Sequence, residues 1–537
     1  MIMMGIMAGL LAGSVAGCGI GGGEENEARQ TVPDDNYRTF YEVFVYSFFD
    51  GNGDGIGDLK GLTEKLNYIG GDVNGTDAGL GCNGIWLMPV MPSGSYHKYD
   101  VTDYYSIDET YGTMEDFANF MEACKERDIH VIMDLVINHT SSAHPWFVQA
   151  SSYLRELGEG EEPKAEECPY VDYYNFSEEK KTGYCELDGR WYYEAVFGGG
   201  MPDLNLGNEK VREEIEGIAD FWLDQGADGF RLDAAKEYYS GRTSDNISFL
   251  AWFNTMVKAK KEDAYLVAEV WTDLNTYASY YKSGIDSVFD FAFADSSGII
   301  ANVVKGITPA GGYGKALEAT EEKFSAYNPD YIGAPFYTNH DLGRSAGYYA
   351  GDNSERQTKI AGALNLMMSG SAYIYYGEEL GMKGSGKDEN KRAPMYWSKA
   401  PETAGMCLGP KAMDNVKMKF DSLEEQKSEE QSIYHYYRNV VRLRNTYPEI
   451  ARGKSVNVEE LSDEQICTVR KTYNGSELLL MMNLSPEERE VDVSGVTVNG
   501  KEAGEKTLAE ELLTGEEPVS AKKQNIELPP YSILIFK

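Results

Sequence analysis

The feature that most constrains the fold is a series of short apolar runs with strand character, most of them separated by helix-like segments. They are YEVFVYSF from Tyr41, GIWLMPV from Gly84, IHVIMDLVI from Ile129, GFRLDA from Gly229, YLVAEV from Tyr265, DSVFDFAF from Asp286, PFYTNH from Pro335 and SAYIYYG from Ser371. Eight is the number of strands that a closed parallel barrel requires. The pattern predicts an α/β fold, a TIM (β/α)8 barrel, over residues 37–139 and 203–446. An open doubly wound sheet is the alternative, but polar motifs at the carboxyl ends of several runs favour the barrel.

Two segments depart from this alternation. A long polar and aromatic stretch follows the third run, and a loop of that length is usually functional. It predicts an inserted domain, residues 140–202, that overhangs the barrel mouth. After the helix-like stretch from Ser432 to Asn445, apolar and polar residues alternate. Residues 447–537 are therefore predicted to form a C-terminal antiparallel β-sandwich domain.

The first residues, MIMMGIMAGLLAGSVAGC, are apolar and contain small residues before Cys18. This run is too short for a confident membrane span and is typical of an export signal. Its end, VAGC, resembles the lipobox at which bacterial lipoproteins are cleaved and acylated, although no Lys or Arg precedes the apolar run. Residues 1–18 are thus predicted to be a signal peptide and residues 19–36 a disordered, Gly- and Glu-rich tether. We expect an exported protein, anchored at the bacterial cell surface or membrane only by a lipid on Cys18.

Charge and cysteine content exclude some classes of function. Lys and Arg number 49 against 87 Asp and Glu, a net charge of −38, which disfavours binding to nucleic acid or anionic membranes. The six cysteines after Cys18 have no metal-ligand spacing. Because the chain is expected to mature outside the cytoplasm, a disulfide is permitted. Cys168 and Cys185 are the pair most suited to one, and Cys124 is expected to be a buried thiol.

Four polar motifs follow predicted strands in chain order. They are DLVINH ending at His139, GFRLDAAKE from Gly229 to Glu237, AEVW around Glu269, and FYTNHD ending at Asp341. Cleaving a glycosidic bond with retention of configuration needs a nucleophilic carboxylate and a protonated one, about 5 to 5.5 Å apart. Asp233 is the candidate nucleophile, since the cation of Arg231 is expected to lower its pKa. Glu269 is the candidate acid/base, because its apolar neighbours favour a raised pKa.

These motifs, in this order, resemble those of the α-amylase family of glycoside hydrolases, family 13, from about Tyr37 to the C-terminus. The resemblance implies that Asp341 is the third carboxylate, which steadies the oxocarbenium-like transition state. It also implies residues that bind the sugar at the cleavage point. His139 and His340 would bind its hydroxyls and Tyr99 would stack beneath it. The other residues of this implied set are Arg231, Lys236 on the leaving-group side, and Asp100 paired with Arg344. Glu237 departs from the histidine that many α-amylases carry there. His97 lies near this set and is equally consistent with a core or surface histidine.

The loop DGNGDGIGD after the first run carries alternating oxygen donors. The donors are the side chains of Asp50, Asn52, Asp54 and Asp58 and the carbonyl of Ile56. Such a loop can wrap a hard cation. It begins like an EF-hand loop, but its twelfth position is Gly61 instead of a bidentate Glu. We therefore predict the Ca²⁺ site of the resembled family, which is structural there, with an unmetallated Asx-rich turn as the alternative. Asn138 is predicted to ligate a second Ca²⁺ near the inserted domain.

Two features bear on bond specificity. Ala234 follows the candidate nucleophile at a position where members that cut α-1,6 bonds often carry Val. The run MPDLN from Met201 to Asn205 lies between the patterns of oligo-1,6-glucosidases and neopullulanases, which is typical of an intermediary group of bacterial lipoprotein α-amylases. The resemblance therefore predicts a monomeric α-amylase that cuts internal α-1,4 bonds of starch and maltooligosaccharides. The alternatives are a cyclomaltodextrinase, neopullulanase, α-glucosidase or transglycosylase on the same site and, more remotely, a non-catalytic glycan-binding protein.

Overall fold

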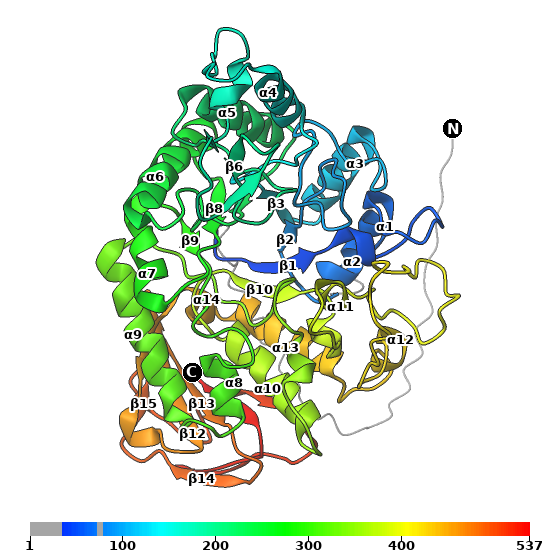
Figure 1. Ribbon diagram of the computed structural model, residues 1–537. Coiled ribbons are helices and arrows are strands. Elements are labelled where there is room, and N and C mark those ends of the chain that lie inside the picture. The colour runs from blue at the N-terminus through cyan, green and yellow to red at the C-terminus, as the bar shows by residue number, and fades with distance from the viewer. Residues whose placement is uncertain (1–34, 72–78) are drawn as a thin grey trace, which may run out of the picture.

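The computed structural model describes residues 35–71 and 79–537 (Figure 1). The predicted signal peptide, the lipobox at Cys18 and nearly all of the predicted tether lie outside these residues. Within them, no helix has the length and apolar character needed to cross a membrane.

A parallel sheet of seven strands forms the centre of the molecule, in the order β10-β1-β2-β3-β7-β8-β9. The strands are β1 (Thr39–Val43), β2 (Gly84–Leu87), β3 (His130–Leu135), β7 (Gly229–Leu232), β8 (Tyr265–Ala268), β9 (Ser287–Val288) and β10 (Ala372–Tyr375). An eighth extended segment, residues 334–336, makes parallel bridges from Phe289 to Ala334 and from Phe336 to Tyr373. Since these bridges join the two edges of the sheet, the barrel closes and the TIM-barrel prediction is confirmed.

The barrel interior is filled by side chains. Rings of Phe40, Tyr265 and Tyr373 stack, with the Phe40 centroid 5.4 Å from that of Tyr265 and 5.0 Å from that of Tyr373. Strands β1, β2, β7, β8 and β10 are buried along their whole length, which explains their continuous apolar sequences. A packed interior leaves only the ends of the barrel for a site.

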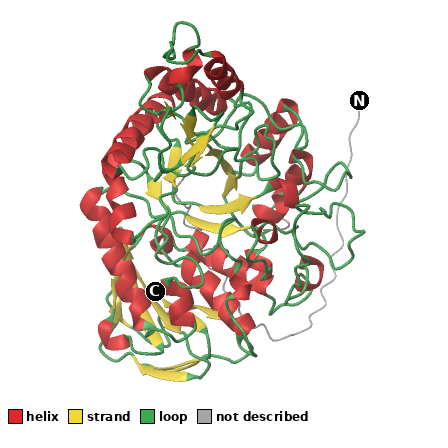
Figure 2. Ribbon diagram, viewed as in Figure 1, coloured by secondary structure: helices red, strands yellow, loops and turns green. Residues whose placement is uncertain are grey.

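Helices surround these strands (Figure 2). A barrel helix packs on the strands through an apolar stripe, as α5 illustrates. Its buried residues recur at helical spacing: Val211, Ile215, Ile218, Ala219 and Trp222. The helices outside the inserted segment are α1 (Leu59–Glu64), α2 (Leu66–Ile69), α3 (Met114–Lys125), α5 (Glu209–Asp224), α6 (Thr243–Lys260), α7 (Leu274–Ala278), α8 (Ile299–Val304), α9 (Gly311–Tyr327), α10 (Ser354–Leu366), α11 (Asp388–Lys391), α12 (Leu423–Gln426), α13 (Ile433–Thr446) and α14 (Pro448–Arg452).

The segment after β3 carries its own small structure at the top of Figure 1. It contains α4 (Pro145–Glu156), β4 (Phe176–Ser177), β5 (Tyr184–Glu186) and β6 (Tyr192–Glu194), and the three strands form an antiparallel sheet in the order β4-β6-β5. The predicted disulfide between Cys168 and Cys185 is wrong, because both are free thiols. Cys168 precedes a 3-10 turn, whereas Cys185 lies in β5 against Gly199. The prediction that Cys124 is a buried thiol is confirmed.

The C-terminal part of the chain forms separate antiparallel sheets. One has five strands in the order β11-β12-β13-β20-β17, another has three in the order β14-β19-β18, and β15 pairs with β16. The strands are β11 (Lys454–Asn457), β12 (Ile466–Tyr473), β13 (Ser476–Asn483), β14 (Arg489–Asp492), β15 (Thr497–Val498), β16 (Lys501–Glu502), β17 (Leu508–Leu513), β18 (Ser520–Lys522), β19 (Asn525–Leu528) and β20 (Ser532–Phe536). Ser455 on β11 hydrogen-bonds Glu321 on α9, so this domain is tied to the barrel.

Candidate active site

The predicted carboxylates lie at one end of the barrel. Asp233 directly follows β7, Glu269 directly follows β8, and Asp341 follows the closing segment 334–336. Because all strands run parallel, their carboxyl ends meet at the same face. Residues more than a hundred positions apart in the sequence are brought together there.

Arg231 holds the two predicted catalytic carboxylates on one guanidinium. Its Nη1 donates to Asp233 Oδ1 at 2.7 Å, and its Nη2 lies 3.0 Å from Glu269 Oε2. Nη1 also donates to Asp134 Oδ1 at 2.8 Å, a residue of β3 that the sequence did not single out. Arg231 is fully buried, so it acts as the fixed cation to which the three carboxylates are bound.

Burial dominates the ionisation of both carboxylates. It raises the pKa of Asp233 to about 6, although Arg231 lowers it. The expectation that Arg231 would lower the pKa of Asp233 is therefore wrong in its net effect, because desolvation outweighs the ion pair. Burial likewise raises the pKa of Glu269, as predicted, against the lowering effect of Arg231. The Ala234 amide also donates to Glu269 Oε2 at 2.9 Å.

Asp341 lies between His340 and Arg392. Its Oδ2 lies 3.1 Å from His340 Nε2, and its Oδ1 accepts from Arg392 Nη2 at 3.1 Å. Burial opposes ionisation of Asp341, but the charges of His340 and Arg392 keep its pKa below the usual range. His340 Nδ1 in turn contacts Glu42 Oε1 at 2.6 Å. Arg392 and Glu42 were not predicted from the sequence, since neither lies within one of the four motifs.

Tyr99 lies in this cluster, whereas the predicted pair of Asp100 and Arg344 does not form. The Tyr99 ring stacks on His340 with centroids 5.4 Å apart, and its hydroxyl donates to Asp134 Oδ2 at 3.0 Å. Asp100 instead accepts hydrogen bonds from the hydroxyls of two nearby serines. Arg344 donates to the backbone carbonyls of Tyr376 and Lys391 and lies over two tyrosine rings. Its guanidinium is therefore committed to the loop after β10, and Arg392 is the arginine that reaches Asp341.

His139 and Asn138 join the barrel to the inserted segment. His139 is buried, which lowers its pKa to about 4, and its Nε2 lies 3.2 Å from the Tyr99 carbonyl. Asn138 Nδ2 donates to Asp203 Oδ1 at 3.1 Å, and the amide of Val196 donates to Asp203 Oδ2 at 3.0 Å. Asp203 belongs to the MPDLN run, so this run clamps the inserted segment to the end of β3.

An open cleft of about 340 Å³ extends from Glu269. Its walls are Phe197, Ala234, Lys236, Glu237, Glu269 and Trp271. Trp271 is 49% exposed and stacks on Phe291, and Phe197 is 44% exposed. Lys236 Nζ pairs with Glu237 Oε1 at 3.2 Å. Exposed aromatic faces beside a carboxyl group suit the binding of sugar rings. Phe197 and Trp271 were not predicted as binding residues, because the sequence does not show which aromatic side chains are exposed.

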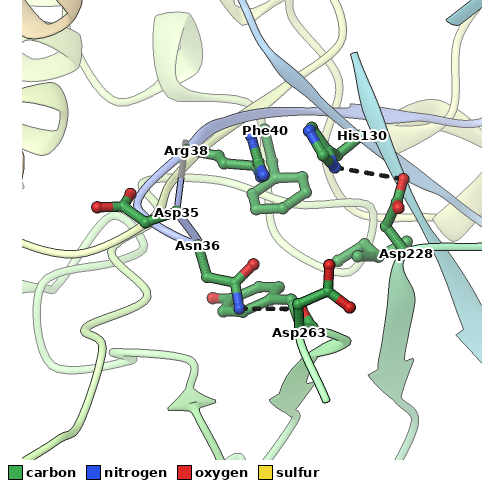
Figure 3. Close-up of a pocket in the computed structure, with 9 residues that line it drawn as sticks. Asp35, Asn36, Arg38, Phe40, His130, Asp228 and Asp263 are labelled. Atoms are coloured by element: carbon green, nitrogen blue, oxygen red, sulfur yellow. Dashed lines mark hydrogen bonds and ion pairs between the residues drawn. The ribbon is translucent and has the colours of Figure 1, made fainter. Parts of the chain in front are cut away.

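A second pocket, of about 210 Å³, lies at the opposite end of the barrel (Figure 3). His130 opens β3 there and faces Asp228, and Asn36 Nδ2 donates to the Asp263 carbonyl at 3.2 Å. None of the predicted site residues lines this pocket. Polar contacts at the amino ends of barrel strands serve the stability of the fold, so the candidate site is the face that carries Asp233.

The predicted calcium loop has suitable donor chemistry. All five predicted donors are oxygens, as Ca²⁺ requires. Here the side chains cap the loop's own amides: Asp50 accepts from Gly53 and Gly55, and Asp58 accepts from Gly51 and Gly61. Asn52 and Asp54 each accept from the amide two residues on. Across residues 35–71 and 79–537, no three acidic, histidine or cysteine side chains gather closely enough to hold a metal, so calcium stays a prediction.

The chain was compared with known families and proteins. The family profile described as "Alpha amylase, catalytic domain" matches residues 42–453. Eubacterium rectale Amy13B has a solved structure that superposes with a TM-score of 0.90 at 49% identity, covering 94% of this chain and 96% of that one. Alpha-amylase 3 of Dictyoglomus thermophilum is 37% identical over 93% of this chain and 92% of its own length.

Relatives with other activities in their names also match. Glucan 1,6-alpha-glucosidase of Streptococcus pneumoniae is 30% identical over 85% of this chain and 92% of its own length. The 4-alpha-glucanotransferase of Thermotoga maritima is 30% identical over 83% of this chain and 96% of its own length.

Proposed function

Since the chain belongs to the α-amylase family of glycoside hydrolases, we propose that it is an α-amylase that cleaves internal α-1,4 bonds of starch and maltooligosaccharides with retention of configuration. Activity on α-glucans follows from the family. The observation that supports the retaining mechanism is that Asp233 and Glu269 bind the same Arg231 guanidinium. Two carboxylates on one guanidinium favour the short separation of retaining enzymes, about 5 to 5.5 Å, over the wider spacing of inverting ones.

The proposed reaction is a double displacement. Asp233, as a carboxylate, attacks the anomeric carbon, while Glu269 gives its proton to the departing glycosidic oxygen. The glycosyl–Asp233 ester is then hydrolysed by a water molecule whose proton passes to Glu269. The ionisation of the two carboxyl groups matches these roles. Asp233 is ionised above about pH 6. Burial raises the pKa of Glu269, so Glu269 keeps its proton to higher pH than an exposed glutamate does.

The remaining residues of the cluster are proposed to bind the cleaved sugar. Asp341, kept ionised by His340 and Arg392, can accept hydrogen bonds from sugar hydroxyls and stabilise the positive charge of the transition state. Tyr99 supplies an aromatic face, and His139 supports the Tyr99 backbone. On the leaving-group side, Lys236 and Trp271 line the open cleft.

Transfer of the glycosyl group to another glucan is a second candidate activity. Trp271 and Phe197 are exposed beside Glu269, so a sugar acceptor can stack there in place of water. The similarity to a 4-alpha-glucanotransferase supports the same possibility. Hydrolysis remains the main proposal because the cleft is open to solvent on that side.

The test of specificity is an incubation with amylose, pullulan and β-cyclodextrin, followed by product size and anomeric configuration. Mixed α-configured oligosaccharides from amylose, with the other two substrates untouched, are expected. Preferential cleavage of pullulan or β-cyclodextrin would reassign the protein to the neopullulanase or cyclomaltodextrinase group. In a separate incubation with maltotriose, products longer than maltotriose would favour the transferase.

We also propose Ca²⁺ in the loop of residues 50–58 and a lipid anchor on Cys18. The loop suits the metal because all its donors are oxygens, and Ca²⁺, when bound, would supply structural stability.

The lipid anchor is supported only by the VAGC run. Labelling of cells with a fatty-acid analogue is expected to mark the wild-type protein and not Cys18→Ala; equal labelling of both would refute the anchor.

A further inference from the structure

Glu42 and His340 form a buried pair behind the candidate active site. Glu42 lies on β1, and its Oε1 is 2.6 Å from His340 Nδ1, with both side chains 1% exposed. The other oxygen of Glu42, Oε2, has no hydrogen-bond partner among the described residues. A buried carboxylate is costly unless a cation compensates it. Glu42 thus lies in an environment that favours a positively charged His340.

We propose that Glu42 is a positioning residue that keeps His340 as a doubly protonated imidazolium, with Nε2–H directed at Asp341. An imidazolium donates from both nitrogens. A neutral ring that donates from Nδ1 to Glu42 could only accept at Nε2. The nearest hydroxyl there, that of Tyr99 at 2.8 Å, already donates its proton to Asp134, so the lone pair would face the Asp341 carboxylate 3.1 Å away. The consequence for catalysis rests on the proposed glycoside hydrolysis, whereas the protonation of His340 does not.

The groups around His340 come from several strands and loops. Asp341 is the next residue on the same loop, Asp134 comes from β3 and Arg231 comes from β7. The hydroxyl of Tyr99 lies 2.8 Å from Nε2. The Trp86 ring of β2 meets the imidazole edge-on with centroids 5.6 Å apart. Burial lowers the pKa of His340, but Asp341 and Glu42 outweigh burial and raise that pKa to about 9.

The proton of this pair belongs to the imidazole. Burial raises the pKa of Glu42 as well, while His340 and Arg231 lower it. An imidazole is intrinsically more basic than a carboxylate by about two pH units, so the shared proton resides on His340. Glu42 then remains ionised.

The charge balance of the site depends on this proton. With Glu269 protonated, the site holds four carboxylates, and their neutralising cations are Arg231, His340 and Arg392. If His340 were neutral, two cations would face the four carboxylates, and ionisation of Asp341 would become costly. Through His340, Glu42 thereby supports the carboxylate that we propose contacts the sugar.

Histidine side-chain NMR on the full chain measures this state directly. The sequence has six histidines, and a His340→Asn variant assigns the ring resonances of His340. In the wild type both ring nitrogens are expected to carry protons at pH 7.5 and to titrate near pH 9. In Glu42→Gln, which keeps the shape but removes the charge, the titration is expected to move down by at least about one pH unit, a tenfold change in protonation ratio.

Glu379→Gln is the matched control. Glu379 is equally buried and bonds the hydroxyls of Tyr41 and Tyr68, so its replacement alters a buried carboxylate without touching His340. The His340 titration should be unchanged in this variant. The kinetic expectation for Glu42→Gln is a lower kcat/KM for maltotriose than wild type at pH 8, and a kcat/KM close to wild type at pH 6, where His340 is protonated in both proteins.

A neutral His340 in the wild type at pH 7.5 would overturn the inference, and that measurement needs no variant to fold. So would an unshifted titration in folded Glu42→Gln. Because the titration is made without substrate, its failure is distinct from failure of the proposed hydrolysis, which product analysis decides.

Discussion

At the scale of single residues, Arg231 organises the site. A guanidinium presents several donors in a fixed plane, and here these donors meet Asp134, Asp233 and Glu269 at once. The two candidate catalytic groups are therefore placed relative to each other by one rigid cation. During the proposed attack Asp233 must be ionised, whereas Glu269 must be protonated.

Asp233→Asn tests the nucleophile. The amide nearly matches the carboxylate in shape but cannot form the glycosyl ester, so kcat is expected to fall by several orders of magnitude while the melting temperature changes little. The measurement is a kinetic assay on maltooligosaccharides together with thermal unfolding. Asp245→Asn serves as the control, since Asp245, in the first turn of α6, is half-exposed and pairs with Arg242, which precedes the helix; activity retained by Asp233→Asn would refute the assignment.

The pH dependence of kcat/KM follows from the same residues. Burial raises the pKa of Asp233 to about 6, and the reaction needs this group ionised. We expect kcat/KM to fall about tenfold for each pH unit below 6, since one essential proton is bound there. A profile that stays flat down to pH 4 would show that Asp233 ionises at the ordinary value and that burial does not control it.

The sequence predicted the residues of the site better than their contacts. Asp233, Glu269 and Asp341 were identified because each follows a strand within a recognisable motif. Arg392 was missed because its ion pair with Asp341 depends on the path of a loop, and Arg344 was paired with Asp100, a contact that does not form. Sequence spacing carries no information on which of two nearby arginines turns toward a carboxylate.

At the scale of elements, the loop of residues 50–58 is the place where a metal would act. It is docked on a distant loop, since the Asp50 amide donates to the Gly405 carbonyl at 3.0 Å and the Leu408 amide to the Gly55 carbonyl at 2.8 Å. Ordering of this loop by a cation would therefore stabilise both segments.

Removal of Ca²⁺ is expected to lower the melting temperature. A ligand at 100 times its Kd stabilises the folded state by about 2.7 kcal/mol, and a chelator removes that contribution. Thermal unfolding with and without chelator measures it, and Asp54→Ala should show a smaller difference. Identical melting curves for the wild type in both conditions would remove this calcium site from the account.

Asp203 is expected to fix the inserted segment to the barrel. In Asp203→Ala, the buried Asn138 amide and the Val196 N–H lose their acceptor, and an unpaired buried amide costs about 1 to 3 kcal/mol. We expect faster proteolysis within residues 140–202 and a lower melting temperature. Glu178→Ala is the control, because Glu178 forms an exposed ion pair with Arg190 in the same segment; equal proteolysis of both variants would argue against the clamp.

The elements themselves were predictable where burial dictates composition. The barrel strands are buried on both faces, so they appear as nearly continuous apolar runs, and all eight were found. The cysteine pair was not predictable, because a disulfide requires a specific geometry between two residues. Position on either side of an irregular segment does not supply that geometry for Cys168 and Cys185.

At the scale of the whole molecule, the two ends of the barrel have separate functions. Carboxylates, cations and aromatic faces gather where the strands end, while the opposite end holds the polar contacts of Figure 3. The net charge of −38 suits an enzyme whose substrate is an uncharged glucan, because such a substrate gains nothing from electrostatic attraction and loses nothing to repulsion.

The most direct test of the account is to trap the glycosyl-enzyme intermediate. In Glu269→Gln, α-maltosyl fluoride should still react, because fluoride departs without a proton donor, whereas hydrolysis of the ester should be slow without the Glu269 base. Mass spectrometry of the digested protein is expected to find a maltosyl group on the peptide that carries Asp233. No adduct, or an adduct on any other residue, would contradict the proposed mechanism.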